Sequence, residues 1–175
     1  MQNHFELFGL PVAFTIDMAA LNHTYRELQK NAHPDRFAGE GEQAQRIAVQ
    51  KSAQINDAFQ TLKAELPRAQ YMLQLIGVEL RGEQTTMRDT EFLMQQMEWR
   101  ETLEDLRHAK DLDGLEDFSD TITAARKIQM NQIAVAFDAG EHQRSPEHWT
   151  NQVRKLAFMV KLSNEIAQAE EALDD

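Results

Sequence analysis

The chain has 175 residues, of which 42% are hydrophobic, 7 are glycine, 4 are proline and none is cysteine, and its formal net charge is −11. This composition allows a buried core in one or two small domains, and it excludes wholesale disorder and an all-β sandwich, which needs more turn-forming residues. The missing cysteines exclude disulfides, thiolate metal sites and a cysteine nucleophile, and the acidic charge disfavours nucleic acid as a partner.

The negative charge is concentrated in the second half of the chain. Residues 1–75 hold 7 Lys or Arg against 8 Asp or Glu, and residues 76–175 hold 11 against 21. The two parts therefore carry net charges of −1 and −10, which indicates different roles for them. The first residues lack the features of a signal peptide, and no apolar stretch reaches the roughly 18 residues of a membrane helix. We therefore expect a cytoplasmic protein with no membrane partner.

The first half of the chain shows the periodicity of three helices, two of which pair as a hairpin. Asp17 is the expected N-cap of a helix that ends near residue 32, and a second helix is expected over about residues 42–62. In both helices apolar residues recur at alternating spacings of three and four, which places them on one face. The polar stretch 33–41 predicts a loop at the tip of an antiparallel hairpin. A shorter helix is expected over about residues 67–77, with proline in its first turn and glycine after its end.

The second half of the chain shows three longer helical patterns. They cover about residues 89–112, 115–138 and 145–173, and the last begins with Ser, Pro and Glu, which favour a helix N-terminus. Residues 78–88 lose this periodicity and form the candidate domain boundary. Three helices with short connections predict a bundle, and no segment alternates polar and apolar residues as a strand does. The predicted fold class is all-α.

The sequence contains no assembled catalytic or metal site. It lacks the G-x-S-x-G nucleophile motif, a glycine-rich phosphate loop and the H-E-x-x-H zinc motif. No two of the six histidines lie four positions apart on one helix, so a metal site is not expected. We therefore expect a protein that is not an enzyme and that uses no metal and no cofactor.

The tripeptide His33-Pro34-Asp35 lies in the loop between the two paired helices. Such a tripeptide alone is an ordinary turn, but between two helices with matching apolar faces it resembles the motif of a J-domain, the module that engages chaperones of the DnaK type. The stretches that carry this resemblance are Phe5–Pro11, His33–Asp35, Ala53–Leu62 and Pro67–Tyr71. With the acidic helical second half, including Arg88–Met94, the whole chain resembles the HscB family of J-type co-chaperones of bacterial iron–sulfur cluster assembly.

This resemblance implies a division of the chain into three parts. Residues 1–76 are expected to form a J-domain, which is an antiparallel helical hairpin with short flanking helices. Residues 77–88 are expected to form a short linker, and residues 89–175 a C-terminal three-helix bundle that packs against the J-domain and binds a scaffold protein. Family members stimulate the ATPase of HscA, a dedicated DnaK-type chaperone, and deliver the scaffold protein IscU to it, which aids maturation and transfer of iron–sulfur clusters. The resemblance implies the same two partners here.

The resemblance places the chaperone-binding site at the hairpin tip. The His-Pro-Asp motif of the family matches His33, Pro34 and Asp35 without a gap. The chemistry is plausible, because an exposed carboxylate on a loop stiffened by proline can form a charge-assisted hydrogen bond to an Arg of the chaperone. The prediction requires that the carboxyl group of Asp35 be exposed and not paired with a cation of its own chain.

Cations near the loop are further candidates for chaperone binding. Arg26 and Lys30 lie away from the apolar face of their helix, and Arg36 adds a positive charge within the loop. The alternative is that these three cations only form part of the hydrated surface, where the negative charge of Glu27 lowers the net positive charge. Ala32 and Arg36 depart from the family pattern, which often has Tyr and Lys there, and the smaller Ala32 puts the packing of the loop in doubt.

Helical geometry indicates a second surface on the helix predicted over residues 89–112. With Trp99 taken to face the core, several apolar and acidic side chains point away from it, and Phe158 is expected opposite the apolar stripe of the last helix. In the HscB family the bundle holds the scaffold protein through apolar and acidic residues. The matching positions, which the resemblance implies as the scaffold-binding site, are Leu93, Met94, Met97, Glu98, Glu101, Asp105 and Phe158. Met97 and Asp105 differ from the residues of the family but keep their character.

Two other interpretations are compatible with the sequence. In the first, the chain is a J-domain co-chaperone with a different client, and the acidic bundle binds an unrelated protein. In the second, the chain is a non-catalytic helical interaction protein, and His33-Pro34-Asp35 is an accidental turn.

Overall fold

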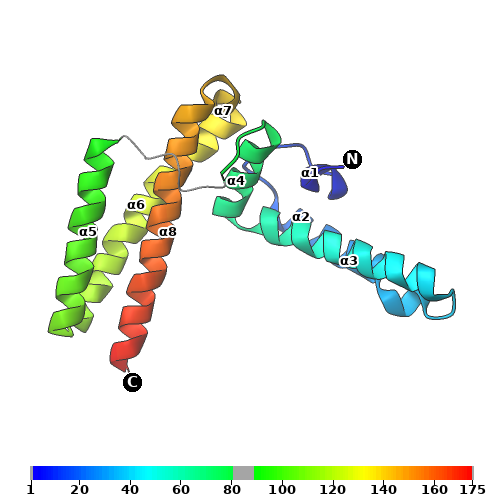
Figure 1. Ribbon diagram of the computed structural model, residues 1–175, viewed down its shortest axis with the longest axis horizontal. Helices are drawn as coiled ribbons and strands as arrows, with labels where there is room; N and C mark the ends of the chain where they lie inside the picture. Colours follow the sequence, from blue (N-terminus) through cyan, green and yellow to red (C-terminus); the bar gives the residue numbers. More distant parts are fainter. Residues whose placement is uncertain (1, 81–88, 175) are drawn as a thin grey trace. The chain divides into compact units, whose positions relative to one another are not determined.

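The computed structural model describes residues 2–80 and 89–174 of the chain. The chain divides into two compact units, Met1–Gly77 and Val78–Asp175 (Figure 1). Every element of regular structure in the described residues is helical, which confirms the predicted all-α class. Of the linker predicted over residues 77–88, the part from 81 to 88 lies outside the described residues.

The N-terminal unit contains the helical hairpin that the sequence predicts. Its elements are α1 (His4–Leu7), α2 (Met18–Ala32), the short 3₁₀ helix η1 (Pro34–Phe37), α3 (Glu42–Lys63) and α4 (Glu65–Leu75). Helices α2 and α3 pack against each other, and η1 lies in the connection between them (Figure 1). The three predicted helices of this half are confirmed, and the apolar start of the chain adds the single turn α1.

Local sequence sets the ends of these helices. The Asp17 side chain accepts a hydrogen bond from the backbone N–H of Ala20 at 3.1 Å, so it is the N-cap of α2. Gly41, with φ of 100°, precedes α3, and Gly77, with φ of 93°, follows α4. These positive φ values favour glycine, which explains why both turns occur at glycines.

The core of the N-terminal unit lies between the hairpin, α1 and α4. Its largest fully buried side chains are Phe5, Leu21, Ile55, Leu62, Met72 and Leu73. A buried cation, Arg68, donates from Nη1 to the backbone oxygen of Leu62 at 2.6 Å, and its guanidinium lies 4.8 Å from the ring centroid of Phe14. A carbonyl and an aromatic face thus compensate the buried charge, and they tie α4 to the end of α3.

The C-terminal unit is the predicted three-helix bundle with one additional turn. Its elements are α5 (Thr90–Ala109), α6 (Leu112–Asp138), α7 (Glu141–Arg144) and α8 (Pro146–Asp174). Helix α6 begins before the predicted residue 115 because Asp111 caps it, accepting a hydrogen bond from the backbone N–H of Gly114 at 2.9 Å. The single turn α7 was not predicted, because so short a helix has no detectable periodicity.

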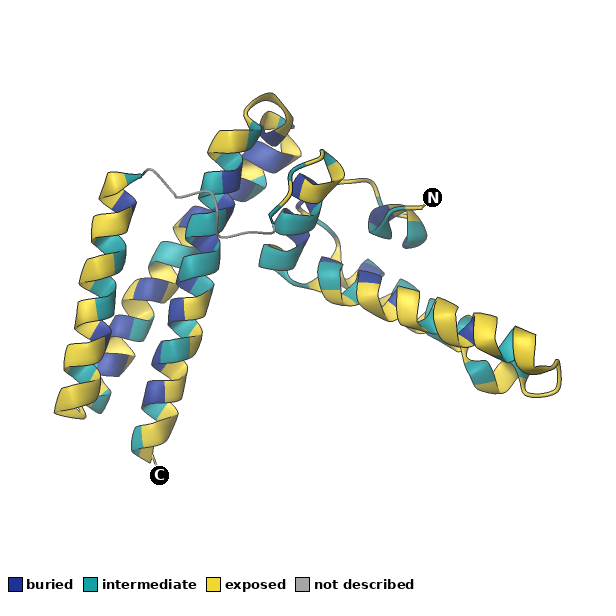
Figure 2. Cartoon of the chain, in the orientation of Figure 1, coloured by how far each residue is buried: buried dark blue, intermediate teal, exposed yellow. Residues whose placement is uncertain are grey.

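Helix α8 buries a broad part of its surface, because it packs on α6 and also contacts α5. The core cluster between these helices is formed by Leu103, Leu115, Phe118, Ile122, Leu162, Ile166 and Ala169. In Figure 2 buried residues recur along α6 and α8, whereas α5 is mostly exposed or intermediate. The predicted bundle helices are confirmed, but α8 buries more than the single stripe that its spacing suggested.

Residues 2–80 and 89–174 contain neither a membrane-spanning helix nor a cluster of metal-binding side chains. No helix in these ranges is long and apolar enough to span a membrane. No group of three or more His, Asp or Glu side chains there is arranged to hold a metal ion.

His142 in α7 is a buried titratable group of the bundle. It is 3% exposed, and its ring stacks on that of Phe137 with the centroids 4.4 Å apart. Among the described residues its Nδ1 has no hydrogen-bond partner. Burial lowers the pKa of His142 below its ordinary value, because the charged imidazolium is disfavoured in this place.

We expect the bundle to lose stability as the pH falls through the ordinary histidine pKa of about 6.5. Near that pH His142 becomes protonated in the unfolded chain, whereas burial opposes its protonation in the folded bundle. The unfolded state therefore binds more protons, and lowering the pH stabilises the unfolded state relative to the folded one. His142→Phe keeps the ring stack and removes the titration. Its urea midpoint should therefore fall less than that of the wild type between about pH 7.5 and 5.5.

Tryptophan fluorescence reports on the bundle alone, because both tryptophans, Trp99 and Trp149, lie in the C-terminal unit. The exposed His108 provides the control, and His108→Gln should keep the pH dependence of the wild type. An equal loss of stability in His142→Phe and in the wild type would contradict the prediction.

Candidate functional site

The His33-Pro34-Asp35 loop is a turn of 3₁₀ helix with its own hydrogen bonds. The Nδ1 of His33 accepts a hydrogen bond from the backbone N–H of Asp35 at 3.2 Å, and the His33 backbone oxygen accepts one from the N–H of Arg36 at 3.0 Å. Pro34 occupies the first position of η1, where an N–H is not needed and the fixed φ stiffens the turn. His33 and Pro34 therefore hold the backbone of Asp35 in place.

The side chain of Asp35 points into solvent. It is 92% exposed, and no Lys or Arg of residues 2–80 and 89–174 forms an ion pair with it. The His33 Nδ1 lies 3.6 Å from an Asp35 carboxylate oxygen. This nitrogen accepts the hydrogen bond from the Asp35 N–H, and the carboxylate oxygens of Asp35 remain open to solvent. The carboxylate can therefore bind a cation of another protein.

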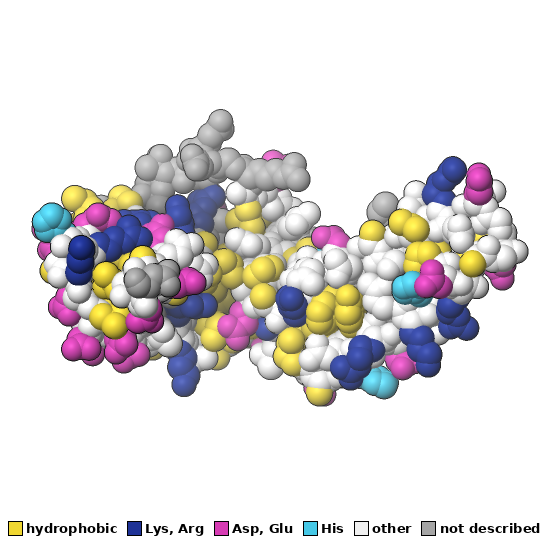
Figure 3. All heavy atoms as spheres, turned by 90° about the horizontal axis from the view of Figure 1, so that it is seen from below, with side chains coloured by type: hydrophobic (Ala, Val, Ile, Leu, Met, Phe, Trp, Pro, Cys, Tyr) yellow, Lys and Arg dark blue, Asp and Glu magenta, His cyan; other side chains and the backbone are white. Residues whose placement is uncertain are grey.

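Positively charged side chains lie on α2 and within the loop itself. Arg26 and Lys30 are exposed on α2, and the exposed Arg36 donates from Nη1 to Asn31 Oδ1 at 3.0 Å. An open hollow of about 550 Å³ beside the loop is lined by Gln29, Lys30, His33 and Arg36. In Figure 3 Lys and Arg side chains recur over the N-terminal unit. A partner that binds the loop therefore meets Asp35 next to a positively charged rim.

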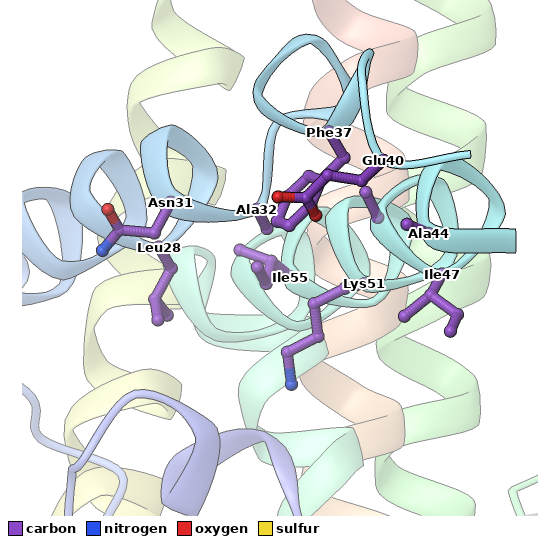
Figure 4. A pocket seen from close by; sticks show the side chains of 10 residues that line it. Leu28, Asn31, Ala32, Phe37, Glu40, Ala44, Ile47, Lys51 and Ile55 are labelled. Atoms are coloured by element: carbon purple, nitrogen blue, oxygen red, sulfur yellow. The ribbon is translucent and has the colours of Figure 1, made fainter. Parts of the chain in front are cut away.

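A second, apolar hollow of about 430 Å³ lies at the same end of the hairpin (Figure 4). Ala32, Ala44 and Ala48 are among its lining residues, so small side chains leave this space open. Side-chain hydrogen bonds join α2 and α3 near this hollow. Ser52 Oγ donates to Gln29 Oε1 at 2.6 Å, and Gln29 Nε2 donates to the Ser52 backbone oxygen at 3.1 Å. The small Ala32 thus leaves a hollow without separating α2 from α3. Gln29 and Ser52 are 23 residues apart, and their pairing was not predicted from the sequence.

Asp89 fixes the start of α5, just before the candidate scaffold-binding residues. Its side chain pairs with Lys155 Nζ of α8 at 2.5 Å and accepts a hydrogen bond from the backbone N–H of Phe92 at 3.0 Å. Two hydrogen bonds hold the pKa of Asp89 below its ordinary value. The one with Lys155 has the larger effect, and the one with the backbone N–H of Phe92 comes second. The ionised Asp89 therefore caps α5 and links it to α8, which sets the direction of the side chains that follow.

The outer face of α5 combines exposed apolar side chains with carboxylates. Leu93, Met94 and Met97 are 39%, 60% and 71% exposed. The residues that we call the outer α5 face are these three together with the exposed Glu98, Glu101 and Asp105. In Figure 3 carboxylates and exposed hydrophobic side chains lie close together on the bundle. Flexible methionines bordered by acidic groups suit a surface that binds another protein.

The prediction that Phe158 lies opposite the core is wrong. Phe158 is partly buried and packs on the bundle core. Its ring meets Phe92 edge-on at a centroid distance of 5.8 Å and is parallel to Trp99 at 6.3 Å. The prediction placed Phe158 relative to a single apolar stripe of the last helix, but α8 buries a wider arc that reaches both α5 and α6. Phe158 lies at the edge of this arc.

Arg100 joins Phe158 in holding α5 against α8, a role that the sequence analysis missed. Its guanidinium lies 5.3 Å from the ring centroid of Phe158, and its Nη1 pairs with Glu165 of α8. Trp99, taken from the sequence as the core direction, is only partly buried beside them. Phe158 therefore supports α5 from the side of α5 that faces α8. Only the part of the Phe158 ring that remains exposed can contact a partner directly.

The chain is similar to known proteins over nearly its whole length, and to a family model over its second half. A family model described as the HSCB C-terminal oligomerisation domain matches residues 88–167. The Co-chaperone protein HscB homolog of Shewanella halifaxensis (strain HAW-EB4) is 46% identical over 177 residues, covering 99% of each chain. The solved structure of chaperone HscB from Vibrio cholerae has a TM-score of 0.83 and 42% identity, with 98% of this chain and 99% of that chain covered. Human co-chaperone protein HscB gives a TM-score of 0.87 at 26% identity, with 96% and 82% covered.

Proposed function

The chain belongs to the HscB family of J-type co-chaperones of iron–sulfur cluster assembly, and from this premise we propose that it stimulates the ATPase of the DnaK-type chaperone HscA and delivers the scaffold protein IscU to it. In this proposal residues 1–76 form the J-domain, residues 77–88 the linker and residues 89–175 the scaffold-binding bundle. The protein acts in the cytoplasm as an adaptor that performs no catalytic step itself.

The exposed carboxylate of Asp35 is the observation that carries the chaperone half of the proposal. An ionised acceptor on a stiff loop suits a charge-assisted hydrogen bond to an Arg of the chaperone's nucleotide-binding domain. Such a contact favours the chaperone state that hydrolyses ATP, so the effect is a coupling between binding and conformation. Arg26, Lys30 and Arg36 then orient the loop against acidic groups of the chaperone.

The outer α5 face supports the scaffold half of the proposal. Its leucine and methionine side chains supply apolar contact area at the centre, and its carboxylates add orientation and a faster encounter with a basic surface. Asp89 and Phe158 contribute by holding α5 in position. The description of the matching family model as an oligomerisation domain also supports association through the bundle.

The test is the steady-state ATPase of HscA with this protein and IscU, added singly and together. An adaptor that binds both proteins raises the effective concentration of one for the other, so we expect the pair to stimulate more than the two single effects combined. Absence of stimulation by this protein alone would contradict the chaperone half. Stimulation that IscU leaves unchanged would contradict the scaffold half and favour a different client.

A further inference from the structure

Two polar contacts join α2 to α3 along the hairpin. Tyr25 Oη donates to Asn56 Oδ1 at 3.1 Å. Four residues further along α2, Gln29 and Ser52 exchange two hydrogen bonds, of 2.6 and 3.1 Å. Four residues forward on α2 thus correspond to four residues back on α3, as in an antiparallel pair. Because a shift of one helix along the other breaks both contacts, these directional hydrogen bonds fix the register of the hairpin.

The Gln29–Ser52 pair lies at the end of α2 that leads into the loop. Within residues 2–80, Gln29 is the α2 residue nearest the loop that a side-chain hydrogen bond joins to α3. Three residues later, Ala32 borders the apolar hollow, which Ala44 and Ala48 of α3 also line (Figure 4). A side chain beside a hollow has fewer packing partners. The Gln29–Ser52 pair therefore attaches the last turn of α2 to α3 where the hollow interrupts apolar packing.

The loop follows the last turn of α2 in position. Helix η1 begins only two residues after α2 ends. Arg36 of η1 donates from Nη1 to Asn31 Oδ1 at 3.0 Å, which ties η1 to that last turn. Gln29 also lines the open hollow beside the loop. The position of Asp35 therefore depends on where the last turn of α2 is held against α3.

We propose that Gln29 and Ser52 are positioning residues for the chaperone contact, because they hold the loop so that the Asp35 carboxylate meets its cation in the productive orientation. This inference rests on the proposed function and adds two residues that neither the tripeptide motif nor the charge pattern identifies. A hydrogen bond weakens steeply when its angle changes, so a loosened loop still binds through its cations but stimulates less. The pair therefore acts on the maximal stimulation more than on the affinity for the chaperone.

Gln29→Met tests the proposal, because Met keeps the length and the helix propensity of Gln but has no amide. The assay is a titration of the HscA ATPase with the full chain. Maximal stimulation by Gln29→Met should fall at least about fivefold, whereas the concentration that gives half of it should change less than about twofold. The matched control is Gln54→Met, which replaces an exposed glutamine of α3 and should stimulate like the wild type.

Two changes at Ser52 grade the effect. Ser52→Thr keeps the hydroxyl group and the backbone oxygen, so it should keep the stimulation of the wild type. Ser52→Ala removes the hydrogen bond from Oγ and leaves the one to the backbone oxygen, so its maximal stimulation should lie between those of Ser52→Thr and Gln29→Met. If Gln29→Met does not fold by circular dichroism, the comparison of Ser52→Ala with Ser52→Thr decides.

Nuclear magnetic resonance relaxation of the free protein tests the attachment of the loop without HscA. The backbone N–H groups of His33, Asp35 and Arg36 should have order parameters near 0.85 in the wild type and in Gln54→Met, and below about 0.7 in Gln29→Met. Order parameters that stay unchanged in Gln29→Met would show that the pair does not hold the loop, and they would overturn the proposal.

The ATPase titration gives the other decisive outcomes. Maximal stimulation by a folded Gln29→Met at the wild-type level would overturn the proposal, and so would a loss of affinity with an unchanged maximum. Equal losses in Ser52→Thr and Ser52→Ala would exclude the hydrogen bond as the cause. Failure of the wild type to stimulate HscA contradicts the proposed function, whereas stimulation that Gln29→Met retains and Asp35→Asn loses contradicts only this inference.

Discussion

Asp35→Asn is expected to abolish stimulation of the HscA ATPase while the fold of the N-terminal unit is retained. Asn has the size of Asp but cannot carry the charge that a charge-assisted hydrogen bond to a chaperone Arg requires. The side chain of Asp35 is 92% exposed, and the loop is held by the backbone N–H of Asp35, which the substitution leaves in place. Steady-state ATPase rates should return to those of the chaperone alone, and circular dichroism should be unchanged.

The control for this variant is Asp57→Asn in α3, which removes another exposed carboxylate from the same unit. Asp57 has a side-chain exposure of 76% and lies away from the His33-Pro34-Asp35 loop in sequence, so its variant should stimulate like the wild type. Stimulation at the full level by a folded Asp35→Asn would refute the proposed role of the carboxylate. Equal losses in both variants would indicate a general effect of charge on the encounter.

Leu93→Ala, Met94→Ala and Met97→Ala combined are expected to weaken scaffold binding roughly 10- to 1,000-fold, or about 1.4–4 kcal/mol. Apolar side chains at the centre of an interface carry most of its binding free energy, and these three are the exposed apolar members of the outer α5 face. Alanine is a good helix former, so α5 should remain helical. Isothermal titration calorimetry of the full chain with IscU measures the change.

The comparison for this variant is Ile128→Ala with Val135→Ala, which removes apolar side chains from α6 of the same bundle and should leave scaffold affinity unchanged. Phe158 is kept in both variants, because its ring packs on Phe92 and Trp99 and its removal would combine lost stability with lost binding. Undiminished affinity of the α5 variant would remove the outer α5 face from the proposal. Loss in the α6 variant alone would move the scaffold site to α6.

The sequence by itself determined the helices and the exposure of the loop. Asp17, Gly41 and Gly77 set helix ends through contacts and backbone angles that span only a few residues. Apolar spacing predicted the hairpin and the bundle, because a helix that packs on one side needs one apolar face. Polar residues around a proline predicted an exposed turn, and Asp35 is exposed there. The exposed apolar residues of α5 followed from the same helical geometry.

Tertiary structure decided the contacts between side chains on helices that are distant in sequence. Phe158 lies beside Phe92 and Trp99 because α8 packs on α6 and also contacts α5, and a spacing measured from one reference residue cannot include that second contact. The hydrogen bonds between Gln29 and Ser52 join positions distant in sequence, so no local pattern reveals them. Burial of a side chain is a property of the space that surrounding elements leave for it, and that space exists only after the chain has folded.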